Sequence, residues 1–389
     1  MKTKDSGAAA KSGHPSSATA VAAMFTLNGA LFGMWASRIP AFTDALQLDH
    51  ATLGLLLLLL AAGAILSFPI AGRMTDKHGA ALVTRLLGFA NCAALILIAF
   101  SPGIATIAVA LFLFGATHGA MDVSMNAWAA ESDRASGKAL MPVFHAVWSF
   151  GAGMGALSGV GAIAMDWLPL AQFGIVGVIL TSLTLWLANI PWQSQTGQDH
   201  GGPLFPLPKG PLLLVGLLAL CSTLGEGAMA DWSAIYLRDA AGATEGLAAA
   251  GYAVFSAAMV CVRLSGAALT RALGPIRATQ TSGAVALIGV LLIVGLATPQ
   301  ATLIGLGFLG RGYGLVVPLA FSRAANDPEL PQAQAIARVA TLSYGGMLLG
   351  PPTIGFLAAT TSLRMSFGLL GVLALGTIML ATVLRPPKS

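Results

Sequence analysis

Ionisable side chains inside long apolar segments carry the strongest chemical signal in this sequence. Glu226 lies near the middle of the apolar segment 211–237. A charge at mid-membrane depth costs roughly 2.5–3.5 kcal/mol on insertion scales, so it normally faces a cavity or a partner. Because a low dielectric favours the neutral form of a carboxyl group, such a group is suited to taking up and releasing protons. We interpret Glu226 as a proton carrier; the alternative is a structural hydrogen bond or ion pair with a neighbouring helix.

A second carboxyl group belongs to a polar stripe in segment 104–129. His118, Asp122 and Asn126 recur every four residues, which places all three on one face of a helix. This stripe is suited to relaying a proton. His145, in segment 140–163, is expected at a depth similar to that of Asp122, so a contact between the two side chains is predicted. The alternative is that His145 packs in the interior and bonds to a backbone carbonyl. The predicted proton-coupling residues are Glu226, Asp122, His118 and His145.

Arg311 is a fixed positive charge in the middle of segment 301–322, between two glycines. It either receives a substrate carboxylate or phosphate through paired hydrogen bonds, or pairs with Glu226 until that group is protonated. A purely structural ion pair is the alternative. Arg263 and Arg338 are interpreted as snorkelling or interface charges.

Further polar and aromatic residues could contact a solute. Asn28 is expected at mid-depth, and three tryptophans are expected as apolar walls, with ordinary packing as the alternative. Asp231 lies about 140° around the helix from Glu226 and is expected to meet Arg38 or Arg238. The predicted substrate-binding residues are Asn28, Trp35, Asn126, Trp148, Asp231, Trp232 and Arg311.

The elements that must position these residues are membrane-spanning helices. Only 9% of the 389 residues are charged, 56% are hydrophobic and the mean hydropathy is +0.81. The apolar segments approach the roughly 20 residues that span a bilayer as a helix, and lipid leaves unpaired backbone groups no partner. We predict an all-α polytopic membrane protein with twelve transmembrane helices in two six-helix bundles. The expected spans are 18–39, 51–72, 81–100, 104–129, 140–163, 168–190, 211–237, 246–269, 278–297, 301–322, 335–357 and 364–384.

The longest polar interruption divides these spans six and six. We predict an N-terminal tail at 1–17, a first bundle at 18–192, a cytoplasmic linker at 193–210, a second bundle at 211–385 and a C-terminal tail at 386–389. Short similarities between the halves, such as Ser149-Phe150-Gly151 and Ser343-Tyr344-Gly345, indicate an internal repeat.

Charge placement predicts the topology and excludes several classes of function. Most lysines and arginines flank loops on the side of both termini, which predicts cytoplasmic termini. The net charge of +5 is scattered over short loops, so no nucleic-acid partner is expected. Cys92, Cys221 and Cys261 lack metal-ligand spacing, and no phosphate-binding loop is present. We therefore expect that the protein is not an enzyme and has no metal or cofactor site. A proton gradient is the expected energy source for transport.

The loop between the second and third spans resembles a known signature. Its sequence, Gly72-Arg73-Met74-Thr75-Asp76-Lys77-His78-Gly79, resembles the signature loop of the major facilitator superfamily. The segments Asn28 to Phe32, Ser37 to Pro40 and His118 to Asn126 resemble its bacterial YbjJ-like branch, itself similar to fucose permease-type symporters. The resemblance implies a monomeric secondary transporter of the bacterial inner membrane. It also implies alternating access, with helices 1, 4, 7 and 10 lining the cavity.

A further group of residues is expected to work the gates. Salt bridges between the bundles would hold an outward-facing state and break on opening. The predicted gating residues are Gly72, Asp76, Gly79, Glu131, Arg134 and Arg323. Gly151, Gly155 and Gly159 resemble the glycine motif of superfamily antiporters, but close packing of helices explains them equally well.

Three functions are compatible with these residues. The first is proton-coupled transport of a small polar or anionic solute, with the solute, protons and the lipid bilayer as partners. The second is proton-driven efflux of amphipathic toxic compounds, which a cavity dominated by Trp, Phe and Met would favour. The third is a non-transporting membrane receptor. The sequence leaves the substrate, its direction, and the choice among symport, antiport and uniport open.

Overall fold

The computed structural model describes residues 16–137, 140–197, 207–330 and 332–385, and these residues form helices joined by short loops. The all-α prediction is confirmed. The predicted terminal tails and the middle of the linker lie largely outside the described residues. The elements of the first half are α1 (Ser17–Ala45), α2 (His50–His78), α3 (Ala80–Ala99), α4 (Ile104–Ser136), α5 (Met141–Ala164), α6 (Pro169–Ala171), the π-helix η1 (Gln172–Gly177) and α7 (Val178–Ala188).

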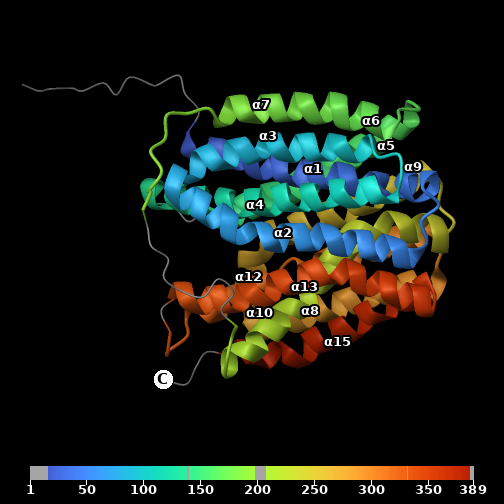
Figure 1. The fold of residues 1–389 in the computed structure, drawn as a ribbon. Helices are drawn as coiled ribbons and strands as arrows, with labels where there is room; N and C mark the ends of the chain where they lie inside the picture. Colours follow the sequence, from blue (N-terminus) through green and yellow to red (C-terminus); the bar gives the residue numbers. More distant parts are fainter. Residues whose placement is uncertain (1–15, 138–139, 198–206, 331, 386–389) are drawn as a thin grey trace, which may run out of the picture.

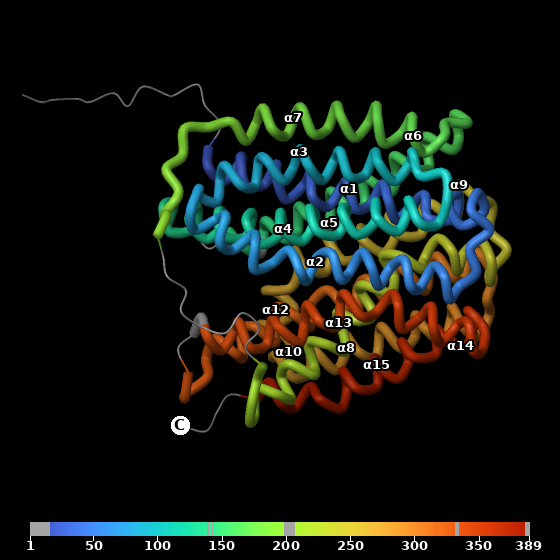
Figure 2. Tube along the Cα trace, in the orientation of Figure 1, coloured from blue at the N-terminus to red at the C-terminus, as the bar shows by residue number. Residues whose placement is uncertain are grey.

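The second half of the chain begins with α8. Figure 1 shows this half, in yellow to red, below the blue and green first half. Most long helices run side by side along one direction (Figure 2). We call the end where α1 begins the terminal end and the other the distal end. The elements are α8 (Pro211–Ile235), η2 (Tyr236–Ala240), α9 (Glu245–Ala249), α10 (Gly251–Leu296), α11 (Pro299–Tyr313), α12 (Val316–Ala325), α13 (Gln332–Thr360), α14 (Leu363–Ser366), α15 (Gly368–Leu380) and η3 (Ala381–Leu384).

Ten segments among the described residues are long and apolar enough to cross a membrane. One of them, Glu245–Leu296, has 52 residues and contains two of the predicted spans. Its helix is kinked at Gly274, where φ is 74° and Pro275 follows. The predicted span at 335–357 falls within α13, which is not among the ten. A polytopic membrane protein is therefore confirmed, and the count of twelve spans stays a prediction.

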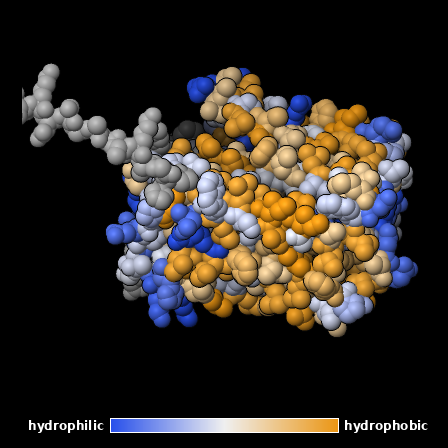
Figure 3. Space-filling model, turned by 90° about the horizontal axis from the view of Figure 1, so that it is seen from above, coloured by the Kyte–Doolittle hydropathy of each residue, from blue (hydrophilic) through white to orange (hydrophobic). Residues whose placement is uncertain are grey.

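The surface between the two ends of the molecule is apolar. Figure 3 shows a broad hydrophobic region with polar side chains gathered toward the two ends. Large side chains lie fully on this surface, for example Trp186 at 69% and Met379 at 77% exposure. Apolar surface of this extent is rare in soluble monomers. It fits a protein whose sides are solvated by lipid.

Glycine seams hold the helices of each half together. A Cβ atom added at Gly29 of α1 would lie 2.1 Å from the carbonyl oxygen of Trp148, and one at Gly155 of α5 would lie 2.1 Å from that of Ala30. The second half repeats this contact between α8 and α13: a Cβ at Gly227 would lie 2.0 Å from the carbonyl oxygen of Met347. The α5 glycines therefore serve backbone packing within the first half.

We expect Gly155→Ala to destabilise the first half, because its methyl group would displace the α1 backbone. Overpacking of this kind typically costs about 1–3 kcal/mol. Gly161→Ala is the matched control, since a Cβ there meets nothing within 4 Å. Thermal unfolding of both variants in detergent measures the effect. Equal midpoints for the two variants would contradict a tightly closed seam.

Candidate functional site

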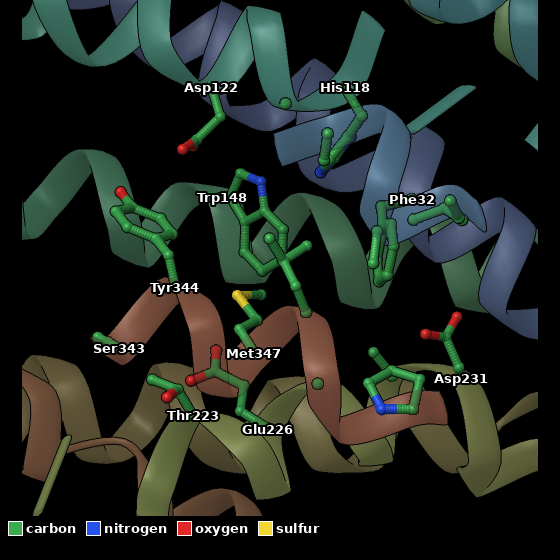
Figure 4. Close-up of a pocket in the computed structure, with 18 of the residues that line it drawn as sticks. Phe32, His118, Asp122, Trp148, Thr223, Glu226, Asp231, Ser343, Tyr344 and Met347 are labelled. Carbon is green, nitrogen blue, oxygen red and sulfur yellow. The ribbon is translucent and has the colours of Figure 1, made fainter. Parts of the chain in front are cut away.

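A cavity lies between the two halves and is lined by both (Figure 4). It has about 1240 Å³ of empty space including its open mouth, which is enough for a small solute. α1, α2, α4 and α5 contribute from the first half, and α8, α10, α12 and α13 from the second. Helices beyond the four expected ones therefore line it. Its main polar side chains are His118, Asp122, His145, Trp148, Thr223, Glu226, Asp231, Arg263, Ser343 and Tyr344.

Glu226 forms an ion pair with Arg263 inside this cavity. The Arg263 Nη2 atom lies 3.2 Å from Glu226 Oε1, and the two side chains are only 15% and 8% exposed. The same guanidinium donates a hydrogen bond to the Ser149 hydroxyl of α5 in the other half. The interpretation of Arg263 as a snorkelling charge is therefore wrong. Its side chain links the acid of the second half to the first half.

Arg311 lies elsewhere, and its predicted pairing with Glu226 is wrong. Its side chain is exposed and lines a second pocket between α10 and α11, together with Cys261 and Ser265. The central cavity is lined instead by Val317 and Phe321 of the following helix, α12. Arg311 lies in the last turn of α11, in the middle of the apolar segment Pro299–Ala325, and residue counting did not define which way that helix faces.

Asp122 faces the cavity, which Tyr344 of the other half also lines. Asn126 donates to Asp122 Oδ1 at 3.1 Å, and the Tyr344 hydroxyl of α13 lies on the side of the cavity where Asp122 is (Figure 4). No hydrogen bond or ion pair between Asp122 and His145 occurs in the described structure, so that predicted contact is wrong. The His145 ring instead packs edge-on against Phe25, with 5.5 Å between ring centroids.

Both histidines line the cavity. His118 packs against Phe32, with 5.3 Å between ring centroids, and its Nδ1 atom lies 3.5 Å from Asn91 Nδ2. The predicted stripe on α4 is thus divided: His118 and Asp122 face the cavity, while Asn126 supports Asp122.

Asp231 lies in the cavity rather than with the arginines it was expected to meet. Trp35 Nε1 donates to Asp231 Oδ1 at 3.2 Å, which joins α1 to α8. Figure 4 shows Asp231 beside Phe32, at the other side of the cavity from Asp122. The expectation was wrong because the cavity follows α8 over several turns, so residues about 140° apart both line it.

Two other predicted contact residues have structural bonds. Trp148 Nε1 donates to Asn28 Oδ1 at 2.8 Å, and Asn28 Nδ2 donates to the His118 carbonyl at 3.3 Å. Asn28 is fully buried and supports Trp148, which lines the cavity. Trp232 is also fully buried and donates to the Pro351 carbonyl at 2.8 Å. Neither Asn28 nor Trp232 is a lining residue.

Sequence reasoning missed several lining residues. Tyr344 and Ser343 appear above only as part of the internal repeat, and Thr223 is a further lining residue. Arg263 was visible as a charge in an apolar segment, the same signal that singled out Glu226. Among the described residues, no cluster of His, Cys, Asp or Glu could hold a metal ion.

At the terminal end, three predicted gating residues bond within their own half. Glu131 accepts hydrogen bonds from Trp192 Nε1 at 2.8 Å and from the Gln195 amide at 2.9 Å. Arg134 donates to the Gln195 side chain at 3.3 Å. Arg323 lies 3.8 Å from Asp327. Among the described residues, these three therefore form none of the predicted bridges between the halves.

The other gating residues belong to the signature loop, most of which is helical: Gly72 and Asp76 lie in the last turns of α2, and Gly79 follows its last residue. Gly79 ends that helix with φ of 88°, and the Asp76 carbonyl accepts a hydrogen bond from the Gly197 amide at 3.0 Å. A Cβ at Gly72 would meet nothing within 4 Å. The loop therefore contacts the start of the linker, and the gating role of Gly72, Asp76 and Gly79 stays a prediction.

At the distal end, polar contacts join the two halves. Arg238, in η2, donates to Asp44 Oδ2 and to the Pro40 carbonyl, both at 2.8 Å. His50 Nε2 lies 3.8 Å from Asp239. α2 and α13 also cross closely here, because a Cβ at Gly355 would lie 2.7 Å from the Gly54 Cα. These contacts hold the two halves together at the distal end.

Comparison with solved structures supports the same fold. The nucleoside transporter NupG, in a mutant form, aligns with a TM-score of 0.74 at 13% identity, covering 95% of this chain and 98% of its own. A bacterial homologue of the human lysosomal transporter Spinster, solved in an inward-facing and unoccupied conformation, aligns with a TM-score of 0.74 at 14% identity, covering 96% and 98%.

Sequence comparison identifies relatives over nearly the whole chain. An uncharacterized transporter of Sinorhizobium fredii is 43% identical, over 94% of this chain and 97% of its own length. An uncharacterized MFS-type transporter of Yersinia pestis is 36% identical, over 90% and 91%. The membrane protein MosC of Rhizobium meliloti is 30% identical, over 93% and 88%. These relatives are named as transporters or membrane proteins, not as enzymes.

The family model of the Major Facilitator Superfamily matches residues 19–330. Together with the relatives and the helical architecture, this match confirms the family resemblance noted in the loop after α2; the YbjJ-like branch stays a prediction. The chain belongs to the Major Facilitator Superfamily of membrane transporters.

Proposed function

We propose that this protein is a proton-coupled secondary transporter that moves a small polar solute by alternating access. The observation that carries the proposal is the Glu226–Arg263 ion pair, which lies in the cavity and is hydrogen-bonded to Ser149 of the other half. Protonation of Glu226 would remove the charge that holds Arg263. The position of Arg263, and with it the contact to Ser149, would then depend on the proton.

The distribution of contacts between the halves supports alternating access. Hydrogen bonds and a close glycine contact join the halves at the distal end. At the terminal end, the described bonds of Glu131, Arg134 and Arg323 remain within one half. We infer that the cavity opens toward the terminal end. In the proposed topology that end faces the cytoplasm of a bacterium, and the protein works as a monomer in the inner membrane.

The cavity lining favours a polar solute over the other classes considered. The anionic option depended on Arg311, which lies outside the cavity, and Arg263 is already paired with Glu226. Amphipathic efflux substrates would suit the aromatic side chains Phe32 and Trp148, but carboxyl and hydroxyl groups share the same space. A solute-driven proton flux distinguishes transport from a receptor function.

We expect Glu226→Gln to uncouple transport, because the amide cannot exchange a proton. The measurement uses proteoliposomes with a pH-sensitive dye inside, to which sugars, amines, organic acids and drugs are offered in turn. Solute-dependent proton flux should fall at least tenfold, whereas exchange of labelled solute across the membrane should continue. Glu245→Gln, an exposed acid at the distal end, is the control and should keep the wild-type flux.

Asp122→Asn is the second variant for this test, and thermal unfolding shows that each variant is folded. Full proton flux in both Glu226→Gln and Asp122→Asn would contradict the assigned coupling residues. Absence of flux in the wild type with every solute would contradict proton-coupled transport itself.

We expect Arg238→Gln to open the distal end more often, because it removes charge-assisted hydrogen bonds to α1 that are each worth about 1.5–3 kcal/mol. A cysteine at Ala230, a lining residue, should then react roughly tenfold faster with an impermeant thiol reagent added from the distal side. Arg364→Gln is the matched control, since Arg364 bonds only to Val294 and Gly295 of its own half. Equal rates in both variants would contradict a gating role for Arg238.

A further inference from the structure

The charged groups of the central cavity do not balance. Its described lining has three carboxyl groups, those of Asp122, Glu226 and Asp231, and one guanidinium, that of Arg263. Arg263 compensates Glu226, which leaves Asp122 and Asp231 without a lysine or arginine partner; His118 and His145 are the other basic side chains of the described lining. Charges that are taken out of water need partners. Protons or bound cations must therefore supply the missing positive charge during the transport cycle.

We propose that the solute carries a protonated amine and that its ammonium group binds Asp231. This inference rests on the proposed transport function and narrows the substrate class. In it, one missing positive charge is the coupling proton, and the other arrives with the solute.

Asp231 has a free bonding position within the cavity. It is 3% exposed, and Oδ1 accepts a hydrogen bond from the neutral Trp35 indole at 3.2 Å. No described side chain donates to Oδ2. Ammonium ions bind carboxylates through short charge-assisted hydrogen bonds. The second oxygen of Asp231 is thus available to a cationic ligand.

An aromatic ring lies at this end of the cavity and packs with others. Phe32 lies beside Asp231 in Figure 4. The Phe32 ring centroid is 6.3 Å from that of Trp148 and 6.3 Å from that of Tyr252. Aromatic faces attract ammonium groups, and the attraction is stronger where water is excluded. A carboxylate beside aromatic rings is therefore a suitable site for an amine.

The other two carboxyl groups are less available. Glu226 is held by Arg263. Asp122 accepts a hydrogen bond from Asn126, and it lies on the other side of the cavity near hydroxyl groups. Those hydroxyl groups, on Thr223, Ser343 and Tyr344, would bind the polar remainder of the solute. The amine end and the polar end of the ligand thus have separate partners.

The preference of the cavity for cations can be measured without knowing the solute. Cys92, Cys221 and Cys261 are replaced by serine, and Met347→Cys places one thiol in the cavity lining. Cationic and anionic methanethiosulfonate reagents of similar size are then compared. Relative to a free thiol in solution, we expect the cationic reagent to be favoured about tenfold or more.

Adding Asp231→Asn should remove most of this preference, whereas Glu245→Gln should leave it unchanged. Trp35→Phe, which removes only the indole donor, should have a smaller effect than Asp231→Asn. An anionic preference, or a cationic preference that survives Asp231→Asn, would overturn the proposal.

A second measurement compares solutes that share one carbon skeleton. Glucosamine, glucose and glucuronate form one set, and phenethylamine, 2-phenylethanol and phenylacetate form another. Each compound is offered to proteoliposomes, with proton flux as the readout. We expect the amine of each set to drive the largest proton flux. Asp231→Asn should lower the flux driven by the amine at least tenfold relative to the flux driven by the neutral compound.

The outcomes separate this inference from the proposed function. Flux driven best by a neutral or acidic member would leave proton-coupled transport standing and overturn the amine assignment. Cationic reagent preference without flux from any compound would support the Asp231 site and count against proton-coupled transport.

Discussion

The energetic cost of charge inside a bilayer is the constraint on which this structure depends. Glu226 and Arg263 face one another in a cavity between the halves, so each compensates the other in a place where water is limited. Removing one partner of such a pair leaves an uncompensated charge, which is expensive. In the proposed function, protonation of Glu226 has the same consequence for Arg263, whose guanidinium would lose its counter-charge and would have to find another partner.

Helix contacts within each half differ in kind from the contacts between the halves. Within each half, glycines bring backbones together so closely that a single methyl group would not fit, as at Gly29 and Gly227. Between the halves, many contacts are polar side chains such as Arg238 with Asp44 and Trp35 with Asp231. Packed backbones resist deformation, whereas hydrogen bonds between side chains exchange readily with water. This combination suits two rigid bodies that change their relative position.

Particular residues show where sequence reasoning reached its limit. Glu226, Asp122, His118, His145, Trp148 and Asp231 were selected from residue type and depth, and all of them line the cavity. Arg311 and Arg263 were both visible as charges in apolar segments, but the one expected in the cavity lies outside it and the other lies within. Asn28 was at the expected depth, yet its amide supports Trp148. Depth along a helix follows from counting residues, whereas rotation about its axis depends on the neighbouring helices.

The sequence by itself determined that the chain is a helical membrane protein, where most of its helices begin, and which family it resembles. These properties follow from local hydropathy, segment length and short motifs, which depend only on residues close together in the sequence. Tertiary structure alone decided that Arg263 is the partner of Glu226, that Tyr344 lies on the same side of the cavity as Asp122 and that Trp35 holds Asp231. Those pairs join residues on different helices, and only the packing of the helices fixes which side chains meet.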